Sequence, residues 1–497
     1  MSFLDRIIDT ALSTLSPEDL GKSLFLFPSK RAILFFTRSL KENEKRPDPL
    51  LMPELMTLSD WIIRCGGYQP ASREALLLQL YRCYRESAGA TPLSFEQFYP
   101  HAQAILVDIV EIDRALLSDE RIRQMATMAQ SSDNQSSAFY TLLELLPALH
   151  ASFCRSLLES GQVHDALALR SLLNRPETLL EQLRPYPAVF ACGFYPINQA
   201  EIELFRRMHR LPQVRFIWDT DRYFIDMPDQ EAGLFFTGAG DLIDPGSITE
   251  NDLLERERRI TLIETQGDID QAKATAAVLS ELAAENTLQA DETALILPDE
   301  SLLLPLLSAI PADYNKINIT MGYPLSQTHL VSLLHRMQEL HRHLEESDGS
   351  VPFKPLYDLL VHPEWSPFLS HQAREQLQTL LRQQSRSIRP EEAADLLGPM
   401  NHILVLPVFP DDLFGMILTV LEELKRRTDI GTHGDRAVPK LELLYQIRRQ
   451  VLAVGRFAAS PDIDLSIGTA WQLLWEFIDQ GSIPFSGEPL EGLQIMG

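Results

Sequence analysis

The Gly-Lys-Ser sequence at residues 21–23 has the residue types that end a phosphate-binding P-loop, in which backbone amides and a lysine hold the phosphates of ATP. A P-loop needs an incoming strand, a glycine-rich turn and an outgoing helix, in that order. Here the order is reversed, because residues 3–15 have helical apolar spacing and residues 23–28 are typical of a buried strand. Ser16 also stands where the motif requires its first glycine. We therefore interpret Gly21 as a helix C-cap and predict no ATP site here.

The elements that would position functional side chains alternate between apolar runs and amphipathic helices. Seven runs are typical of strands covered on both faces, because their apolar residues are nearly continuous. These runs are residues 23–28, 188–194, 214–219, 260–264, 293–298, 317–320 and 492–496. Helical patterns follow several of them, so the sequence predicts parallel α/β sheets.

Two long helical blocks, at about residues 72–183 and 328–480, interrupt these runs. We therefore predict two α/β domains, each with a large helical insertion. The predicted ranges are 1–66 with 185–255 for the first domain, 67–184 for its insertion, 256–327 with 481–497 for the second domain, and 328–480 for its insertion. The strand-like run ending at Gly497 predicts an incomplete second sheet, as in a gene fragment that ends within a domain.

The composition is that of an ordinary globular protein with a net charge of −25. Four cysteines without a CxxC pair favour a reducing compartment over a disulfide framework or a zinc site. No run approaches the ~18 apolar residues of a membrane span, so we expect a cytoplasmic protein without membrane contact. The acidic charge opposes non-specific nucleic-acid binding, yet residues 22–46 carry seven basic and two acidic side chains, a local charge of +5.

Seven segments occur in a recognisable order along nearly the whole chain: FLFPSKRAILFFTRSL, VFACGFYPINQAEIELF, IWDTDRYF, ITLIETQGDIDQAK, ALILPDESLLLPLL, NITMGYPLSQT and EGLQIMG. Together they resemble the N-terminal, helicase-like part of AddB-type proteins of the PD-(D/E)XK nuclease family, in the Bacteroidetes-like branch. The resemblance implies two RecA-like domains of a degenerate superfamily 1 helicase, followed by a nuclease domain beyond Gly497. It also implies a role in processing broken DNA ends for recombinational repair.

The resemblance places DNA contact at Ser29, Lys30 and Arg31, with Arg38 further along the same basic stretch. The segment FPSKR is similar to the helicase motif that touches the backbone of single-stranded DNA. It follows a predicted strand at the edge where open α/β sheets bind ligands. Basic side chains and a hydroxyl there can bind phosphates. A solvated loop is the alternative.

The resemblance also marks the strand at 188–194 as the place where active relatives carry acidic residues for Mg²⁺ and water. Here Cys192 and Gly193 stand at that position, and Glu201 on the following helix remains as a single carboxylate. A neutral thiol does not replace the carboxylate oxygens that Mg²⁺ requires. We therefore expect a helicase fold that no longer hydrolyses ATP, with these three residues as relics of the site.

A formal match to the nuclease motif exists at Asp411 and Glu423-Leu424-Lys425. The sequence between them predicts one amphipathic helix, capped by Pro410 and Asp411, that separates the two carboxylates by about 18 Å. They cannot share a metal ion, so we expect no catalytic or metal-ligating residue in this chain and Mg²⁺ only in a downstream nuclease domain. The histidines at 335, 341 and 343 lie on different helix faces, and we interpret them as packing or surface residues.

These observations favour a non-hydrolysing, DNA-binding scaffold within a DNA end-processing nuclease. Its expected partners are DNA, as a single strand or a broken duplex end, and an AddA-type helicase-nuclease subunit. Two alternatives stay open at this point. One is an active ATP-dependent helicase subunit, and the other is an acidic protein-binding scaffold without DNA contact.

Overall fold

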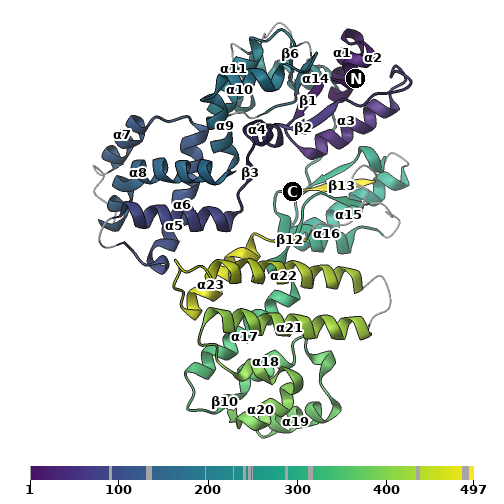
Figure 1. Cartoon of the computed structure of the whole chain (residues 1–497). Helices are drawn as coiled ribbons and strands as arrows, with labels where there is room; N and C mark the ends of the chain where they lie inside the picture. The colour runs from purple at the N-terminus through teal and green to yellow at the C-terminus, as the bar shows by residue number, and fades with distance from the viewer. Residues whose placement is uncertain are drawn as a thin grey trace. The chain divides into compact units, whose positions relative to one another are not determined.

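A computed structural model describes residues 2–88, 92–129, 137–195, 198–227, 229–238, 242–243, 248, 250–285, 289–311, 317–431, 437–483 and 492–497. The chain forms two compact units (Figure 1). The first comprises Met1–Leu93 and Phe98–Glu264, and the second comprises Ser94–Gln97 and Thr265–Gly497. Among the described residues, no helix is both long and apolar enough to cross a membrane.

The first unit contains a four-stranded parallel sheet with the strand order β2-β1-β5-β6. Its strands are β1 (Leu24–Phe27), β2 (Glu54–Thr57), β5 (Val189–Cys192) and β6 (Val214–Ile217). Every residue of β1 and β5 is buried, as the continuous apolar runs predicted, and Phe25 stacks on Phe190 at 4.6 Å. Three of these strands confirm the sequence analysis, whereas β2 was not predicted.

Helices pack on this sheet through apolar faces: α1 (Phe3–Thr14), α2 (Pro17–Gly21), α3 (Lys30–Glu42), α4 (Leu58–Gly66) and α11 (Gln199–His209). The core that joins α1 and α3 to β1 and β5 includes Ile7, Ile8, Phe36, Leu40 and Phe190. Smaller helices in this unit are α12 (Arg222–Asp226), α13 (Glu231–Gly238) and α14 (Asp252–Glu255).

The predicted order around the Gly-Lys-Ser sequence is confirmed, because α2 precedes β1. The predicted capping role of Gly21 is wrong. Gly21 is the last residue of α2, and Lys22 caps the helix in a right-handed conformation. A glycine is needed there for a different reason, since a Cβ at residue 21 would lie 2.5 Å from the Cβ of Leu51.

The helical insertion of the first unit forms its own packed group (Figure 1). It contains α5 (Arg73–Ser87), α6 (Phe95–Arg114), α7 (Asp119–Ala129), α8 (Ser137–Ser160), α9 (Asp165–Leu173) and α10 (Pro176–Leu183). Two short strands, β3 (Gln69–Pro70) and β4 (Gln162–Val163), pair in parallel beside these helices. The helix α9 packs on α4, which connects this group to the sheet.

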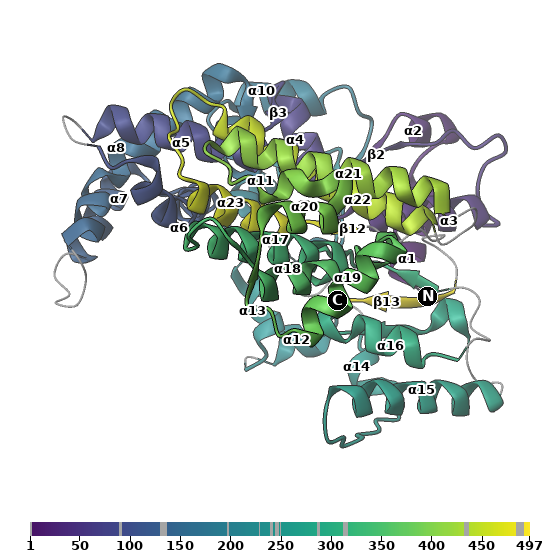
Figure 2. The same cartoon turned by 90° about the horizontal axis from the view of Figure 1, so that it is seen from below.

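The second unit contains a three-stranded parallel sheet in the order β7-β13-β8. Its strands are β7 (Ala294–Ile296), β13 (Leu493–Met496) and β8 (Ile317–Ile319). The helix α16 (Leu303–Ala309) lies beside β13, and α15 (Asp268–Ala284) packs on α16 (Figure 2). The buried amide of Asn318 donates to Gln494 Oε1 at 2.6 Å, which ties β8 to β13. The strand predicted at 260–264 is wrong, because these residues form no strand and Leu262 is 93% exposed.

The second helical block contains α17 (His329–Glu345), α18 (Phe353–Leu360), α19 (His371–Arg382), α20 (Pro390–Leu397), α21 (Pro410–Gly431), α22 (Ala437–Ala458) and α23 (Ile467–Asp479). Antiparallel pairs join β9 (Tyr323–Pro324) to β12 (Ser482–Ile483) and β10 (Val351–Pro352) to β11 (Ser387–Ile388). The helices α21 and α22 run side by side (Figures 1 and 2).

The single helix predicted between Asp411 and Glu423 is confirmed as α21. Arg426 and Arg427 hold Glu423 in hydrogen-bonded ion pairs, and Arg426 above all lowers the pKa of this carboxyl to about 2. The predicted cap is off by one residue. Asp412, rather than Asp411, accepts hydrogen bonds from the amides of Val408 and Phe409.

Candidate nucleic-acid interface

The turn from β1 to α3 contains only Pro28 and Ser29, so the chain passes directly from strand to helix at the carboxyl edge of the first sheet. The hydroxyl of Ser29 caps α3 by accepting a hydrogen bond from the amide of Ala32 at 3.2 Å. A phosphate-binding loop needs several glycines between strand and helix, and this turn has none. At the sheet edge where RecA-like folds bind nucleotides, a capped helix therefore takes the place of the phosphate-binding loop.

The four predicted DNA contacts lie on α3 and its cap. Lys30 is 82% exposed at its side chain and Arg31 covers the ring of Phe35 at 5.4 Å. Arg38 lies seven residues after Arg31, a spacing that places both on one helix face. The opposite face is held in the core by Phe36 and Leu40. The structure thus gathers the predicted basic side chains into one stripe, in which Lys30 and the neighbouring Lys41 are exposed and Arg31 and Arg38 are half-buried.

Carboxylates from other elements reduce the charge of this region. Asp9 pairs with Lys45 at 2.8 Å, Glu18 pairs with Lys22 at 2.6 Å, and Asp60 lies 3.9 Å from Lys30. These three carboxylates lie outside residues 22–46, so they lower the local charge from +5 to +2. The Glu42 carboxylate additionally pairs with Arg38 at 3.1 Å. Carboxylates therefore face α3 at both ends, Asp60 beside Lys30 and Glu42 beside Arg38.

The end of β5 has no group that binds Mg²⁺ tightly. Cys192 is fully buried, and burial raises the pKa of its thiol well above the usual value, so the sulfur stays neutral. Gly193 adopts a left-handed φ of +67°, and a Cβ there would lie 2.8 Å from Cε1 of Phe3. Cys192 and Gly193 lie at the end of β5 and pack against α1. Packing therefore explains why a thiol and a glycine occupy these two positions.

Glu201 begins α11 as part of a capping box. Its carboxylate accepts the amide hydrogen of Asn198, while the Asn198 side chain accepts the amide hydrogen of Glu201. Burial raises the pKa of Glu201, and the Asn198 amide and Arg114 oppose that shift. The Glu201 carboxylate therefore caps the N-terminus of α11. This capping role explains the residue without a catalytic function.

A cavity of about 260 Å³ lies at this sheet edge, between the turn at Pro28 and the first turns of α4, α9 and α11. Among its described lining residues the basic group is Arg114, which already pairs with Glu111 at 2.8 Å and Asp165 at 3.6 Å. A nucleoside triphosphate brings several negative charges and its Mg²⁺ needs carboxylate oxygens beside phosphates. The lining carboxylates of Asp165 and Glu201 are occupied, because Asp165 pairs with Arg114 and Glu201 caps α11, so this cavity has the position of a nucleotide site but not its chemistry.

A buried polar cluster in the helical insertion was missed by the sequence analysis. The Asp113 carboxylate is fully buried and receives the guanidinium of Arg170 at 3.1 Å and Nε2 of His150 at 2.9 Å. Its second oxygen lies 3.4 Å from Nε2 of His164 and 3.8 Å from the sulfur of Cys154. The residues lie far apart in sequence, and only the spacing of His150 and Cys154, one helical turn on α8, was a visible signal.

The same cluster brings ligand atoms of Asp113, His150 and Cys154 within 4.8 Å of one another, which is compatible with a metal ion. Two contacts argue for an ion-pair network instead. Arg170 holds its place by donating to the carbonyl oxygen of Leu117 at 2.7 Å as well. Nδ1 of His164 accepts the amide hydrogen of Leu167, so neutral His164 carries its proton on Nε2, facing Asp113. Arg170, His150 and Cys154 donate to this carboxylate, whereas Nε2 of His164 lies 3.4 Å away without a hydrogen bond.

The burial of His164 predicts a pH dependence of stability. Burial lowers the pKa of His164 in the folded state, so the unfolded chain binds a proton more readily as the pH falls below about 6.5. Stability is therefore present above that pH and lost below it. We expect His164→Asn, which keeps a capping acceptor without an ionisable ring, to remove up to about 1.4 kcal/mol of the stability lost between pH 7.5 and about pH 5.5. Urea unfolding at the two pH values measures this, and equal losses in both proteins would contradict it.

No family model and no curated protein matches this chain. All four cysteines carry free thiols. Of the predicted site residues, the structure brings Ser29, Lys30, Arg31 and Arg38 onto one helix and its cap. It places Cys192 and Glu201 at the same sheet edge, in roles that packing and capping explain. The carboxylates that lower the charge of the basic stretch come from separate elements, and for that reason the sequence did not reveal them.

Proposed function

We propose that this chain is a non-hydrolysing, helicase-like DNA-binding scaffold of a DNA end-processing nuclease for recombinational double-strand-break repair. The observation that carries the proposal is the direct turn from β1 into α3, which puts a basic helix, and no phosphate loop, at the carboxyl edge of a parallel sheet. Its resemblance to the helicase-like part of AddB-type proteins supports the same conclusion.

In this proposal α3 holds the backbone of a DNA strand. Lys30, Arg31 and Arg38 pair with successive phosphates, and the Ser29 hydroxyl donates a further hydrogen bond. Such contacts position a strand without reading its sequence. Catalysis and its Mg²⁺ belong to a downstream nuclease domain, strand separation belongs to an AddA-type helicase-nuclease subunit, and the free thiols fit the reducing cytoplasm.

The net charge of −25 supports a second candidate, an acidic scaffold that binds proteins and not DNA. The two candidates differ in one property. A phosphate-binding surface releases counterions, so its DNA affinity falls steeply as salt rises, whereas an acidic scaffold retains no DNA at any salt concentration.

The absence of hydrolysis is tested with purified protein, Mg-ATP and single-stranded DNA. We expect phosphate release at the level of a protein-free blank, because phosphoryl transfer depends on charge neutralisation that the edge of the first sheet does not supply. A DNA-stimulated release well above the blank would contradict the proposal. Lys22→Ala then decides its origin. A loss of activity in this variant would assign a P-loop role to Lys22, which in the structure pairs with Glu18 at 2.6 Å.

A further inference from the structure

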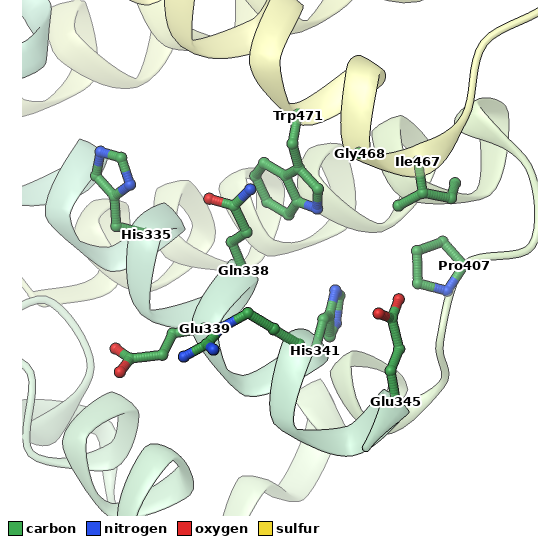
Figure 3. A pocket seen from close by; sticks show the side chains of 10 residues that line it. His335, Gln338, Glu339, His341, Glu345, Pro407, Ile467, Gly468 and Trp471 are labelled. Carbon is green, nitrogen blue, oxygen red and sulfur yellow. The ribbon is translucent and has the colours of Figure 1, made fainter.

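In the helical block of the second unit, the cavity between α17 and α23 has a volume of about 420 Å³ (Figure 3). The rings of His341 and Trp471, whose centroids lie 6.5 Å apart, belong to its wall, but they are only 3% and 2% exposed, so packing covers them. The exposed wall carries Arg342 and Glu345, two side chains of opposite charge, and therefore selects neither an anion nor a cation. The unbalanced charge of this helical block lies on the surface of α22.

One face of α22, which we call the arginine face, combines three arginines with an aromatic ring. It comprises Tyr445, Arg448, Arg449, Leu452 and Arg456. Positions three, four, seven and eleven residues after Tyr445 lie on the same side of an α-helix. All five residues are exposed, Tyr445 by 58%. Ile447, Val451 and Val454 on the opposite side are buried, so packing directs the arginine face to solvent.

The three arginines of this face form no ion pair with any residue that the structure describes. The sequence explains this result, because no Asp or Glu lies three or four positions from any of them. Other exposed arginines in the same helical block are paired. Arg336, Arg389 and Arg426 each pair with a glutamate three positions away, at 2.9, 2.6 and 2.7 Å. Within the described part of the chain, the positive charge of the arginine face is therefore not neutralised.

The helix α22 contains one carboxylate, that of Glu442. It accepts a hydrogen bond from the side-chain amide of Gln446 at 2.7 Å, and Arg449 donates to the oxygen of the same amide at 3.5 Å. A neutral amide does not cancel the charge of a guanidinium. With four basic side chains and one acidic side chain, α22 carries a charge of +3 in a chain whose net charge is −25. Such a local excess of positive charge attracts an anionic partner.

We propose that the arginine face of α22 is a second binding surface for single-stranded DNA. Its guanidinium groups pair with phosphates, to which a planar guanidinium donates two parallel hydrogen bonds. The ring of Tyr445 stacks on a base, which only an unpaired strand exposes. From Tyr445 to Arg456 the face extends about 16 Å, at about 1.5 Å per residue, which is long enough for several phosphates of one strand. The identity of the nucleic acid as DNA rests on the function proposed above.

The position of Tyr445 favours a nucleic acid over an acidic protein segment. Its ring lies one helical turn before Arg448 and Arg449, so a base that stacks on the ring keeps its own phosphate near a guanidinium. Glutamate side chains also pair with arginine, but they offer no flat ring to the tyrosine. The combination of arginines with an exposed aromatic ring therefore matches a single strand.

Fluorescence anisotropy of a labelled oligothymidylate, measured with the full chain at several salt concentrations, tests this surface. We expect the triple change Arg448→Gln, Arg449→Gln and Arg456→Gln to weaken binding about tenfold at low salt. It also flattens the slope of log affinity against log salt by about 2, because each lost phosphate contact removes about 0.7. Circular dichroism and thermal unfolding verify that the variant is folded.

The matched control is the triple change Arg336→Gln, Arg389→Gln and Arg426→Gln, which removes the same three charges from the same helical block. Each of these arginines pairs with a glutamate, so its charge is already balanced. We expect the control to keep the affinity and the salt slope of the natural protein.

The single change Tyr445→Ala tests the stacking contact. We expect it to weaken binding of oligothymidylate about fivefold, which is the size of one base–aromatic stack. The salt slope stays unchanged, because the tyrosine is uncharged. Duplex DNA, whose base faces are covered, binds equally well to this variant and to the natural protein.

The outcomes separate this inference from the proposed function. If the triple change in α22 weakens binding but Lys30→Glu with Arg31→Glu does not, the inference holds and α3 is not the contact. If only the change in α3 weakens binding, or if the α22 change and its control act equally, the inference is overturned and the proposed function stands. A glutamate-rich peptide that binds the natural protein but not the α22 variant, with oligothymidylate binding unchanged, assigns the face to an acidic protein partner and also overturns the inference. A natural protein that binds no oligothymidylate contradicts both.

Discussion

Replacing Asp113 by Leu is expected to lower the free energy of unfolding by about 3–5 kcal/mol. The substitution removes the carboxylate that accepts hydrogen bonds from Arg170, His150 and Cys154, and it leaves the guanidinium without its buried counter-ion. The loss of a partner costs more than the pair itself stabilises, because the remaining charge stays desolvated. Urea unfolding followed by circular dichroism measures the effect.

Two further variants make this result specific. Asp108→Asn changes an exposed carboxylate on the same helix, α6, and is expected to alter stability by less than about 0.5 kcal/mol. Combining Asp113→Leu with Arg170→Met is expected to recover part of the loss, since neither partner is then left alone. The network interpretation is wrong if Zn²⁺ raises the melting temperature of the natural protein and Asp113→Leu abolishes that increase, because the cluster would then be a metal site.

The second large effect concerns DNA. The double change Lys30→Glu and Arg31→Glu is expected to weaken binding of single-stranded DNA by about tenfold or more at low salt, which corresponds to about 1.4 kcal/mol. Both side chains lie at the start of α3, where the Lys30 side chain is 82% exposed and the guanidinium of Arg31 lies over the ring of Phe35. Fluorescence anisotropy of a labelled oligonucleotide measures the change.

The control carries the same change in net charge on the other unit. Lys354→Glu with Arg389→Glu reverses two side chains that are 83% and 77% exposed and that pair with Asp358 and Glu392. We expect this control to bind DNA nearly as well as the natural protein. Equal weakening by both double variants would mean that total charge, and not the stripe on α3, governs the interaction.

Most of the sheet was predictable from sequence because its strands are continuous apolar runs. The runs that became β1, β5, β6, β7, β8 and β13 were all recognised. The strand β2 was missed since only Leu55 and Met56 of its four residues are apolar, and it forms because β1 offers it a parallel partner. Residues 260–264 have an apolar, strand-like sequence but form no strand. A strand needs a neighbouring backbone to pair with, and strand propensity alone does not provide one.

The candidate site was predictable only in part, and the reason is distance along the chain. The basic side chains of α3 are adjacent in sequence, so the sequence analysis found them. The carboxylates Asp9 and Asp60, which lower the charge beside them, come from α1 and α4. The Asp113 cluster and the Trp471–His341 pair likewise join helices separated by dozens of residues, and hydrophobic periodicity carries no information about such pairs.

The measurement that tests the central claim most directly is the affinity for single-stranded DNA as a function of salt concentration. Each phosphate contact contributes about −0.7 to the slope of log affinity against log salt, so contacts by Lys30, Arg31 and Arg38 predict a slope of about −2 or steeper. The Lys30→Glu, Arg31→Glu variant is predicted to flatten that slope by about 1.4. Undetectable binding at low salt, or an affinity that salt does not change, would contradict a DNA-binding function for this chain.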